Sequence, residues 1–266
     1  MQIEPGQVAV VTGGTSGIGF ALADVLVRRG VDVMIADIRE GAIPVAVDAL
    51  SGHSGRAAGV RADVGVDADV DALADETLER FGRVDLVCNN AGVVCEQSPI
   101  WEQRLETWRW LIDVKLMGVV HGIRSFAPLF IAQGYGHFLN TASAGGLMPL
   151  PTLAPYNATM HAVVGLTETL NAELRSVSAG LGATVLCPGM VDTALGANSA
   201  ALVPQGAATT GGGAMPDGAM KPSAVATAAI AAVEAGRVHA IVGPGTATVV
   251  RQRVDGLLAD LAEPVT

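Results

Sequence analysis

Residues 8–29 read VAVVTGGTSGIGFALADVLVRR, and this stretch decides the fold. Its first residues form the short apolar run of a buried strand, and its last residues have helical periodicity. Between them Gly13, Gly17 and Gly19 follow the spacing G-x-x-x-G-x-G. Strand, glycine turn and helix are the context of a dinucleotide site, because a pyrophosphate can lie at the helix N-terminus. A glycine-rich turn without a ligand has the same pattern, so other residues must show whether this turn binds a dinucleotide.

The rest of the chain repeats this alternation. Apolar runs typical of strands occur at 31–36, 56–64, 84–88, 136–143, 183–187 and 238–242, and helical patterns occur at 69–81, 111–126, 157–178, 222–235 and 249–261. Apolar residues make up 50% of the sequence but aromatic residues only 4%, so the core is largely aliphatic, which suits a buried parallel sheet. The alternation, with no internal repeat, predicts one α/β domain over residues 1–266. We expect a Rossmann-like, doubly wound parallel sheet of about seven strands with helices on both faces.

An acidic residue ends the second predicted strand. Asp37 lies eighteen residues beyond Gly19, close to the spacing at which a carboxylate meets the adenosine ribose. A carboxylate there accepts hydrogen bonds from ribose hydroxyls and repels a 2′-phosphate, which favours NAD over NADP. Arg39 leaves NADP open, because its guanidinium could reach a phosphate. A helix cap or turn acid is the alternative role of Asp37.

A second group of candidate functional residues lies in the middle of the chain. Ser143 precedes Tyr156 by thirteen residues, and three prolines, Pro149, Pro151 and Pro155, make the segment between them a stiff loop. The helical spacing that follows places Tyr156 at the start of a helix. A hydroxyl next to a phenol is a plausible arrangement for passing a proton to a carbonyl oxygen.

Together these motifs resemble the short-chain dehydrogenase/reductase family, in which the serine is followed by Tyr-x-x-x-Lys. Residues 89–92 read NNAG, residues 63–64 read DV and residues 188–193 read PGMVDT, each matching a family motif. The resemblance implies catalysis by Ser143 and Tyr156 and binding of a nicotinamide cofactor. The implied cofactor-binding residues are Gly13, Thr15, Ser16, Gly17, Ile18, Gly19, Asp37, Asp63, Val64, Asn90, Ala91, Gly92, Tyr156, Pro188, Gly189, Val191 and Thr193.

Two positions depart from the family pattern. Met160 stands where the family has the lysine that lowers the tyrosine pKa, and Lys115 stands where it has an asparagine. We hypothesise that the positive charge has moved, with Met160 packing along the Lys115 stem and the ammonium serving Tyr156. The alternative is that Lys115 reaches solvent, Met160 is simply core, and the protein binds NAD without turnover.

The resemblance therefore implies an NAD-dependent alcohol dehydrogenase or ketone reductase acting on a secondary alcohol or ketone, with a catalytically silent NAD-binding scaffold or sensor as the alternative. An apolar substrate is expected, because the loop residues Gly145, Leu147, Met148, Leu150 and Leu153 offer it no charged partner. Residues 194–220, rich in Ala, Gly and Thr, are expected to form a mobile lid.

The net charge and the counts of histidine and cysteine limit the kinds of binding partner that we expect. A net charge of −10 does not favour nucleic acid or an anionic membrane, and we expect no membrane-spanning run and no signal peptide. The five histidines show no metal-ligand spacing, so no metal is expected. Three cysteines at irregular spacing (Cys88, Cys95 and Cys187) favour reduced thiols and a cytoplasmic location. The helices at 115–126 and 162–174 carry apolar residues on more than one face, and the family resemblance implies that they pair subunits into a homodimer or homotetramer.

Overall fold

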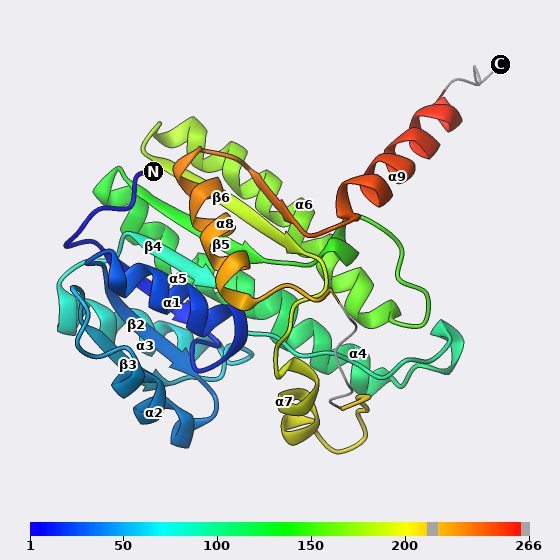
Figure 1. Cartoon of the computed structure of the whole chain (residues 1–266), viewed down its shortest axis with the longest axis horizontal. Helices are drawn as coiled ribbons and strands as arrows, with labels where there is room; N and C mark the ends of the chain where they lie inside the picture. Colours follow the sequence, from blue (N-terminus) through cyan, green and yellow to red (C-terminus); the bar gives the residue numbers. More distant parts are fainter. Residues whose placement is uncertain (212–217, 262–266) are drawn as a thin grey trace.

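A parallel sheet runs through the middle of the molecule (Figure 1). The computed structural model describes residues 1–211 and 218–261, and within them seven strands pair in the order β3-β2-β1-β4-β5-β6-β7. The strands are β1 (Val8–Thr12), β2 (Asp32–Asp37), β3 (Ala57–Arg61), β4 (Leu86–Asn89), β5 (Gly136–Thr141), β6 (Leu181–Pro188) and β7 (His239–Val242). The predicted doubly wound α/β fold is confirmed.

Helices cover both faces of this sheet. They are α1 (Gly17–Arg28), α2 (Ile43–Ala49), α3 (Asp67–Phe81), α4 (Leu105–Leu111), α5 (Gly118–Gln133), α6 (Ala154–Val177), α7 (Leu195–Leu202), α8 (Pro222–Glu234) and α9 (Thr246–Leu261). Short 3₁₀ turns occur at Glu40–Ala42, Ile100–Glu102 and Ala144–Gly146, and a π-helical turn at Ile112–Met117 joins α4 to α5.

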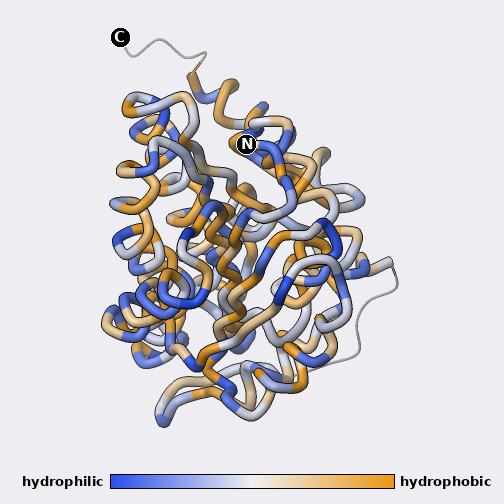
Figure 2. The backbone as a smooth tube through the Cα atoms, turned by 90° about the vertical axis from the view of Figure 1, so that its left-hand side faces the viewer, coloured by the Kyte–Doolittle hydropathy of each residue, from blue (hydrophilic) through white to orange (hydrophobic). Residues whose placement is uncertain are grey.

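The strand residues alternate between two apolar layers. Ala9 and Val11 of β1 are fully buried with residues of α1 and α8, whereas Val10 lies on the other face with residues of α3, α5 and α6. In Figure 2 orange, hydrophobic segments predominate along the strands in the middle of the molecule. Because both faces are covered, the strands read as continuous apolar runs rather than alternating ones.

The strand order fixes where a ligand can bind. The chain runs from β1 outward to β2 and β3 and then returns to pair β4 with the other side of β1. Loops after β1 and β4 therefore diverge to opposite faces and leave a crevice at the carboxyl ends of these strands. Doubly wound sheets bind their ligands at such a switch point.

The helix predicted at 111–126 is longer and less regular than its pattern indicated. Helical structure runs without a break from Leu105 to Gln133, but Ile112–Met117 is π-helical and contains Lys115. A π turn inserts extra chain into a helix and disturbs the 3.6-residue periodicity on which the sequence pattern depends. This helix also corrects the expectation that no apolar run could span a membrane, because Leu105–Gln133 is long and apolar enough. It packs here on α3, α6 and the sheet, which accounts for its apolar character.

The predicted lid contains a helix. Residues 195–202 form α7, where we expected little ordered structure, and Ser199 on α7 is fully buried. A β-bridge between Val191 and Met220 ties together the two ends of the segment. Residues 212–217 of the predicted lid lie outside the described residues, and its mobility stays a prediction.

A pair of helix glycines provides a test of the packing. An added methyl at Gly122 in α5 would collide with the buried Asn89 side chain, whereas one at Gly165 in α6 meets nothing within 4 Å. We expect Gly122→Ala to destabilise the protein by about 1–3 kcal/mol through overpacking. Gly165→Ala should stabilise it by about 0.5–1 kcal/mol, because alanine favours the helix. Urea unfolding of the two variants measures both, and equal effects would contradict this packing.

Candidate active site

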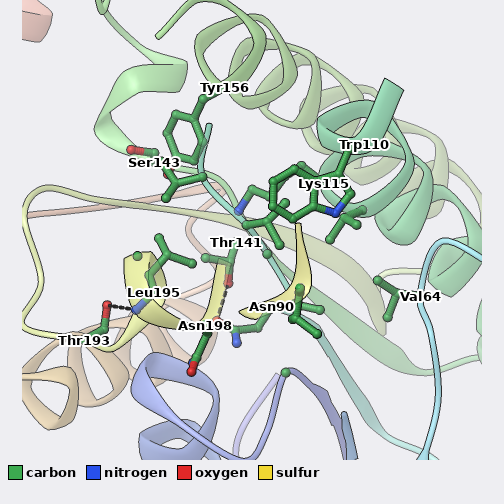
Figure 3. Close-up of a pocket in the computed structure, with 18 of the residues that line it drawn as sticks. Val64, Asn90, Trp110, Lys115, Thr141, Ser143, Tyr156, Thr193, Leu195 and Asn198 are labelled. Carbon is green, nitrogen blue, oxygen red and sulfur yellow. Dashed lines mark hydrogen bonds between the residues drawn. The ribbon is translucent and has the colours of Figure 1, made fainter. Parts of the chain in front are cut away.

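A cleft of about 1170 Å³ opens at the carboxyl ends of β1, β4 and β5 (Figure 3). It contains most of the predicted site. The predicted residues that line it are Gly13, Ser16, Ile18, Asp37, Asp63, Val64, Asn90, Ala91, Gly92, Lys115, Ser143, Tyr156, Pro188, Gly189, Val191 and Thr193. Thr15, Gly17 and Gly19 are not part of the lining, and their contribution to cofactor binding stays a prediction.

The glycine turn is tightly packed against the loop after β4. Gly13 has a left-handed φ of 63°, and a Cβ there would lie 2.9 Å from the Cα of Ala91. A Cβ at Gly19 would collide with the carbonyl of Gly13 and the side chain of Asn90. Gly19 therefore permits the close packing of helix and turn.

Asn90 joins three strands at this point. Its amide Nδ2 donates to the carbonyl of Thr12 at 3.1 Å, and its backbone N–H donates to the Thr12 hydroxyl at 2.9 Å. The hydroxyl of Thr141 donates to Asn90 Oδ1 at 3.3 Å. These bonds link the ends of β1, β4 and β5 and hold the floor of the cleft, which explains why polar residues follow strands here.

Asp37 ends β2 and remains a carboxylate in a nearly buried position. Thr15 donates its hydroxyl to Oδ2 at 2.5 Å, and the backbone N–H of Arg39 donates to Oδ1 at 3.0 Å. Burial alone would raise the pKa of Asp37, but the hydrogen bonds from Thr15 and Arg39 outweigh it and hold the pKa below its usual range. The charged acceptor needed to bind ribose hydroxyls is therefore present.

Asn198, on α7, is a residue that the sequence reasoning missed. Arg39 donates from Nη1 to Asn198 Oδ1 at 2.8 Å and from Nη2 to the Ser16 hydroxyl at 3.0 Å. Asn198 Nδ2 donates to the same hydroxyl at 3.2 Å. These three residues, which we call the clasp, connect α7 to the glycine turn across the edge of the cleft. No sequence signal marks an asparagine in an alanine-rich segment as a partner of residues so far away in the chain.

Ser143 and Tyr156 converge on the cleft as predicted. Ser143 caps the short 3₁₀ turn after β5, where its hydroxyl accepts from the N–H of Gly145 at 3.1 Å. Tyr156 lies in the first turn of α6, behind Pro155. Burial raises the pKa of Tyr156, and its hydrogen bond with the Ser143 side chain lowers it only in part. The phenol is thus held protonated unless another group favours the phenolate.

Lys115 turns its side chain into the protein. It is only 5% exposed, and its Nζ lies 5.5 Å from the centroid of the Tyr156 ring. A Cβ on Gly92 would lie 2.5 Å from that Nζ, so the ammonium occupies space that only glycine leaves open. In Figure 3 Lys115 reaches into the pocket below Tyr156 and Ser143. The alternative in which the lysine extends to solvent is therefore wrong.

Burial acts on the charge of this lysine. It lowers the pKa of Lys115 from 10.5 to about 8, and among the described residues none forms a hydrogen bond or ion pair with its ammonium. Met160, where the family lysine would stand, is fully buried in an apolar cluster with Val163 and the ring of Tyr156. Its packing along the Lys115 stem stays a prediction.

The other end of the cleft is partly apolar. Gly145, Met148, Leu150 and Leu153 line it as predicted, whereas Leu147 packs into the core beside α6 instead. Glu106 and Arg109 of α4 also line the cleft. The expectation of an apolar substrate, which rests on the loop residues, stays a prediction. The helical pattern around α4 gave no indication of which side faces the cleft.

The predicted absence of a metal site meets no contrary observation. Within residues 1–211 and 218–261 no group of His, Cys, Asp and Glu could hold a metal ion. The three cysteines are free and buried, and burial raises the pKa of the Cys187 thiol to about 12. These thiols are therefore structural groups in strands and loops.

Comparison with known proteins agrees with this geometry. Residues 7–202 match the family model for short chain dehydrogenases. The chain is 37% identical over 195 residues to 1-deoxy-11-beta-hydroxypentalenate dehydrogenase of Streptomyces avermitilis, covering 73% of this chain and 71% of that protein. It is 32% identical over 238 residues to 3beta-hydroxysteroid dehydrogenase 2 of Eggerthella lenta, covering 88% and 91%.

A solved structure extends the likeness to the whole chain. A short chain dehydrogenase/reductase from Burkholderia phymatum in complex with NAD has a TM-score of 0.89 and 36% identity, with 100% of both chains covered. The doubly wound sheet and its switch-point cleft define the class of Rossmann-like α/β proteins. Within that class, the chain belongs to the short-chain dehydrogenase/reductase family.

The buried lysine provides a test by stability alone. Because the pKa of Lys115 is about 8 in the native state and 10.5 in the free side chain, the unfolded state binds more protons between these values. Stability therefore rises with pH across that window, and below it the full cost of burying the ammonium remains. We expect Lys115→Met to stabilise the protein at pH 7 by about 3 kcal/mol, and this gain to shrink as pH rises from 8 toward 10.5.

Thermal unfolding without cofactor, from pH 6 to pH 10.5, measures this difference. The matched control is Lys221→Met, which removes the chain's other lysine, an exposed side chain paired with Asp192 at 3.0 Å. A surface pair of this kind contributes about 0–1 kcal/mol, so its effect should be small and independent of pH in this range. A Lys115 variant whose gain is absent or does not change with pH would show that the ammonium is not desolvated.

Proposed function

We propose that the protein is an NAD-dependent oxidoreductase that interconverts a secondary alcohol and a ketone of a largely apolar small molecule. In this role Lys115 replaces the usual catalytic lysine. One observation carries the proposal: a buried ammonium lies beside the ring of the one tyrosine that faces Ser143. A lysine is rarely buried without a partner, because its desolvation is costly. The cost is understandable if the charge serves Tyr156.

The side chains divide the chemistry in a simple way. The nicotinamide, when bound, accepts a hydride from the alcohol or donates one to the ketone. Ser143 donates a hydrogen bond to the substrate oxygen and stabilises the negative charge that develops there. Tyr156 takes the proton from the alcohol in oxidation and returns a proton to the oxygen in reduction.

Lys115 sets the proton affinity of Tyr156. Burial alone favours the neutral phenol, so the tyrosine would be a poor base at neutral pH. A cation within about 4–6 Å of an acidic group favours its charged form and lowers its pKa by about 1–3 units. The ammonium of Lys115, whose Nζ lies 5.5 Å from the centroid of the Tyr156 ring, would supply that charge from α5's side of the cleft rather than from α6.

The adenosine end favours NAD. Asp37 faces the cleft as a carboxylate, which accepts bonds from ribose hydroxyls and repels a 2′-phosphate. Arg39, the residue that kept NADP open, has its guanidinium engaged with Thr15, Ser16 and Asn198. The Burkholderia phymatum relative, which was solved in complex with NAD, is consistent with this choice.

A catalytically silent scaffold is the alternative. It is favoured by Met160, which removes the family lysine, and by the raised pKa of Tyr156. Both candidates bind cofactor, so only turnover separates them.

The decisive experiment measures turnover and binding together. Purified protein is screened with NAD and a panel of cyclic and acyclic secondary alcohols, following reduced-cofactor absorbance, while NADH and NADPH affinities are titrated separately. Lys115→Met should lower kcat/KM by about 100-fold or more while leaving the NADH affinity within a few fold. It should also move the acidic limb of the pH profile for alcohol oxidation upward, because Tyr156 must be deprotonated to act as the base, and a merely structural role would not do this.

Restoring the family arrangement supplies the rescue. The double variant Lys115→Asn and Met160→Lys should recover turnover that Lys115→Asn alone loses, and Lys221→Met should leave it unchanged. If wild-type protein binds NADH but no alcohol is oxidised, the scaffold is favoured. If turnover is measurable and Lys115→Met retains it, the relocated lysine is wrong even though the enzyme assignment stands.

The clasp predicts how the cofactor leaves. Because Asn198 bonds Arg39 and Ser16 across the cleft edge, it should slow the release of bound NADH. Losing these neutral and charged hydrogen bonds should make NADH dissociation about 3- to 10-fold faster in Asn198→Ala. Stopped-flow displacement measures the rate. Ala201→Asn, an exposed change on the same helix, is the control, and an unchanged rate in Asn198→Ala would contradict the clasp's role.

A further inference from the structure

The last helix stands apart from the rest of the molecule. In Figure 1 α9, in red, extends away from the body beyond β7. From Arg251 to Leu261 every residue is exposed, and β7 is a neighbour that α9 contacts only near its start. A helix of this length is marginal in water by itself, so its stability requires a surface to pack against.

This helix has an apolar stripe with no cover in the described chain. Val250, Val254, Leu257 and Leu261 follow spacings of four, three and four residues, which places them on one side of a helix. Val254 is 43% exposed, Leu257 52% and Leu261 77%, and Leu258 beside them is 58% exposed. Contiguous apolar surface of this kind marks a site of association.

The charged residues beside the stripe can pair with the same residues of a second, identical helix. Arg253 and Asp260 are seven residues apart, so they lie on the same flank of the stripe within about 20° of rotation. Neither forms an ion pair within the part of the chain that the structure describes. When two identical helices pack antiparallel, each flank faces the same flank of its partner. When they pack parallel, each flank faces the opposite one.

The antiparallel arrangement also matches the register of the stripe. Placing Val250 opposite Leu261 brings Val254 opposite Leu257, which keeps the whole stripe covered. In that register Arg253 of one helix is offset from Asp260 of the other by about 3 Å along the axis, within reach of an arginine. Two-fold symmetry makes the ion pair twice.

We propose that α9 is an association surface for a second copy of this chain, whose own α9 packs against it antiparallel. The apolar stripes form the contact, and Arg253 pairs with Asp260 of the other copy at both ends. This interface differs from the helices at 115–126 and 162–174 that the sequence pattern indicated. It is independent of the proposed catalytic function, since no residue of the cleft takes part.

Charge reversal tests the register directly. Full-length protein is analysed by sedimentation velocity over a concentration series. The measured quantity is the dissociation constant of the largest oligomer that forms. Arg253→Glu and Asp260→Arg each place like charges opposite one another, and each should weaken that assembly about tenfold. The double variant restores opposite charges and should return the association to near the wild-type value. Arg80→Glu, at an exposed arginine of α3, is the matched control and should change nothing.

The apolar stripe has its own test. Leu257→Glu should abolish the association that depends on α9, with circular dichroism and the NADH affinity confirming that the body of the protein remains folded. A wild-type protein that is monomeric throughout the series would overturn the proposal and assign α9 to a different partner. Single reversals without effect, or a double variant that fails to recover, would overturn the antiparallel pairing.

Discussion

The desolvated ammonium of Lys115 is the constraint on which the active-site arrangement depends. A positive charge inside a protein is costly unless a partner compensates it, and none of the described residues supplies a hydrogen bond to this one. Its surroundings are the Tyr156 ring, the Gly92 backbone and the open cleft. A ring face attracts a cation, and a phenolate would attract it more strongly. The site therefore has a charge that becomes better satisfied as the tyrosine loses its proton.

At the other end of the cleft, Asp37 and Arg39 form a connected set of hydrogen bonds. Asp37 keeps its charge through bonds from Thr15 and Arg39, and the remaining donors of Arg39 reach Ser16 and Asn198. One guanidinium thus links the end of β2 and the glycine turn to α7. The predicted adenosine site and the predicted lid share these hydrogen bonds, although they lie far apart in the chain.

The fold was predictable because its signals are local. The VAVVT strand, the spaced glycines and the alternation of apolar runs with helical patterns indicate a doubly wound sheet without any knowledge of tertiary contacts. The positions of Ser143, Tyr156 and Lys115 in one cleft followed from family motifs. The inward turn of Lys115 needed the structure, since sequence alone allows a long flexible side chain to reach solvent.

What the sequence did not indicate depends on distant contacts. Asn198 lies in an alanine-rich segment, and its bonds to Arg39 and Ser16 arise only when α7 folds over the cleft. Glu106 and Arg109 have a helical pattern that does not say which side lines a cavity. The helix at 249–261 was predicted from its pattern, but only the exposure of its apolar side chains shows that the body of the protein leaves them uncovered.

The π-helical turn at Ile112–Met117 has a consequence for how the lysine is aimed. Trp110 and Lys115 both line the cleft although they are five residues apart, whereas neighbours on one side of an α-helix are three or four apart. The wider turn is what brings both to the same side. In a regular α-helix a residue five positions after Trp110 would lie about 140° away from it around the axis, so the two side chains would point in different directions. The direction in which the Lys115 side chain points thus depends on the number of residues in this helical turn as well as on the presence of a lysine.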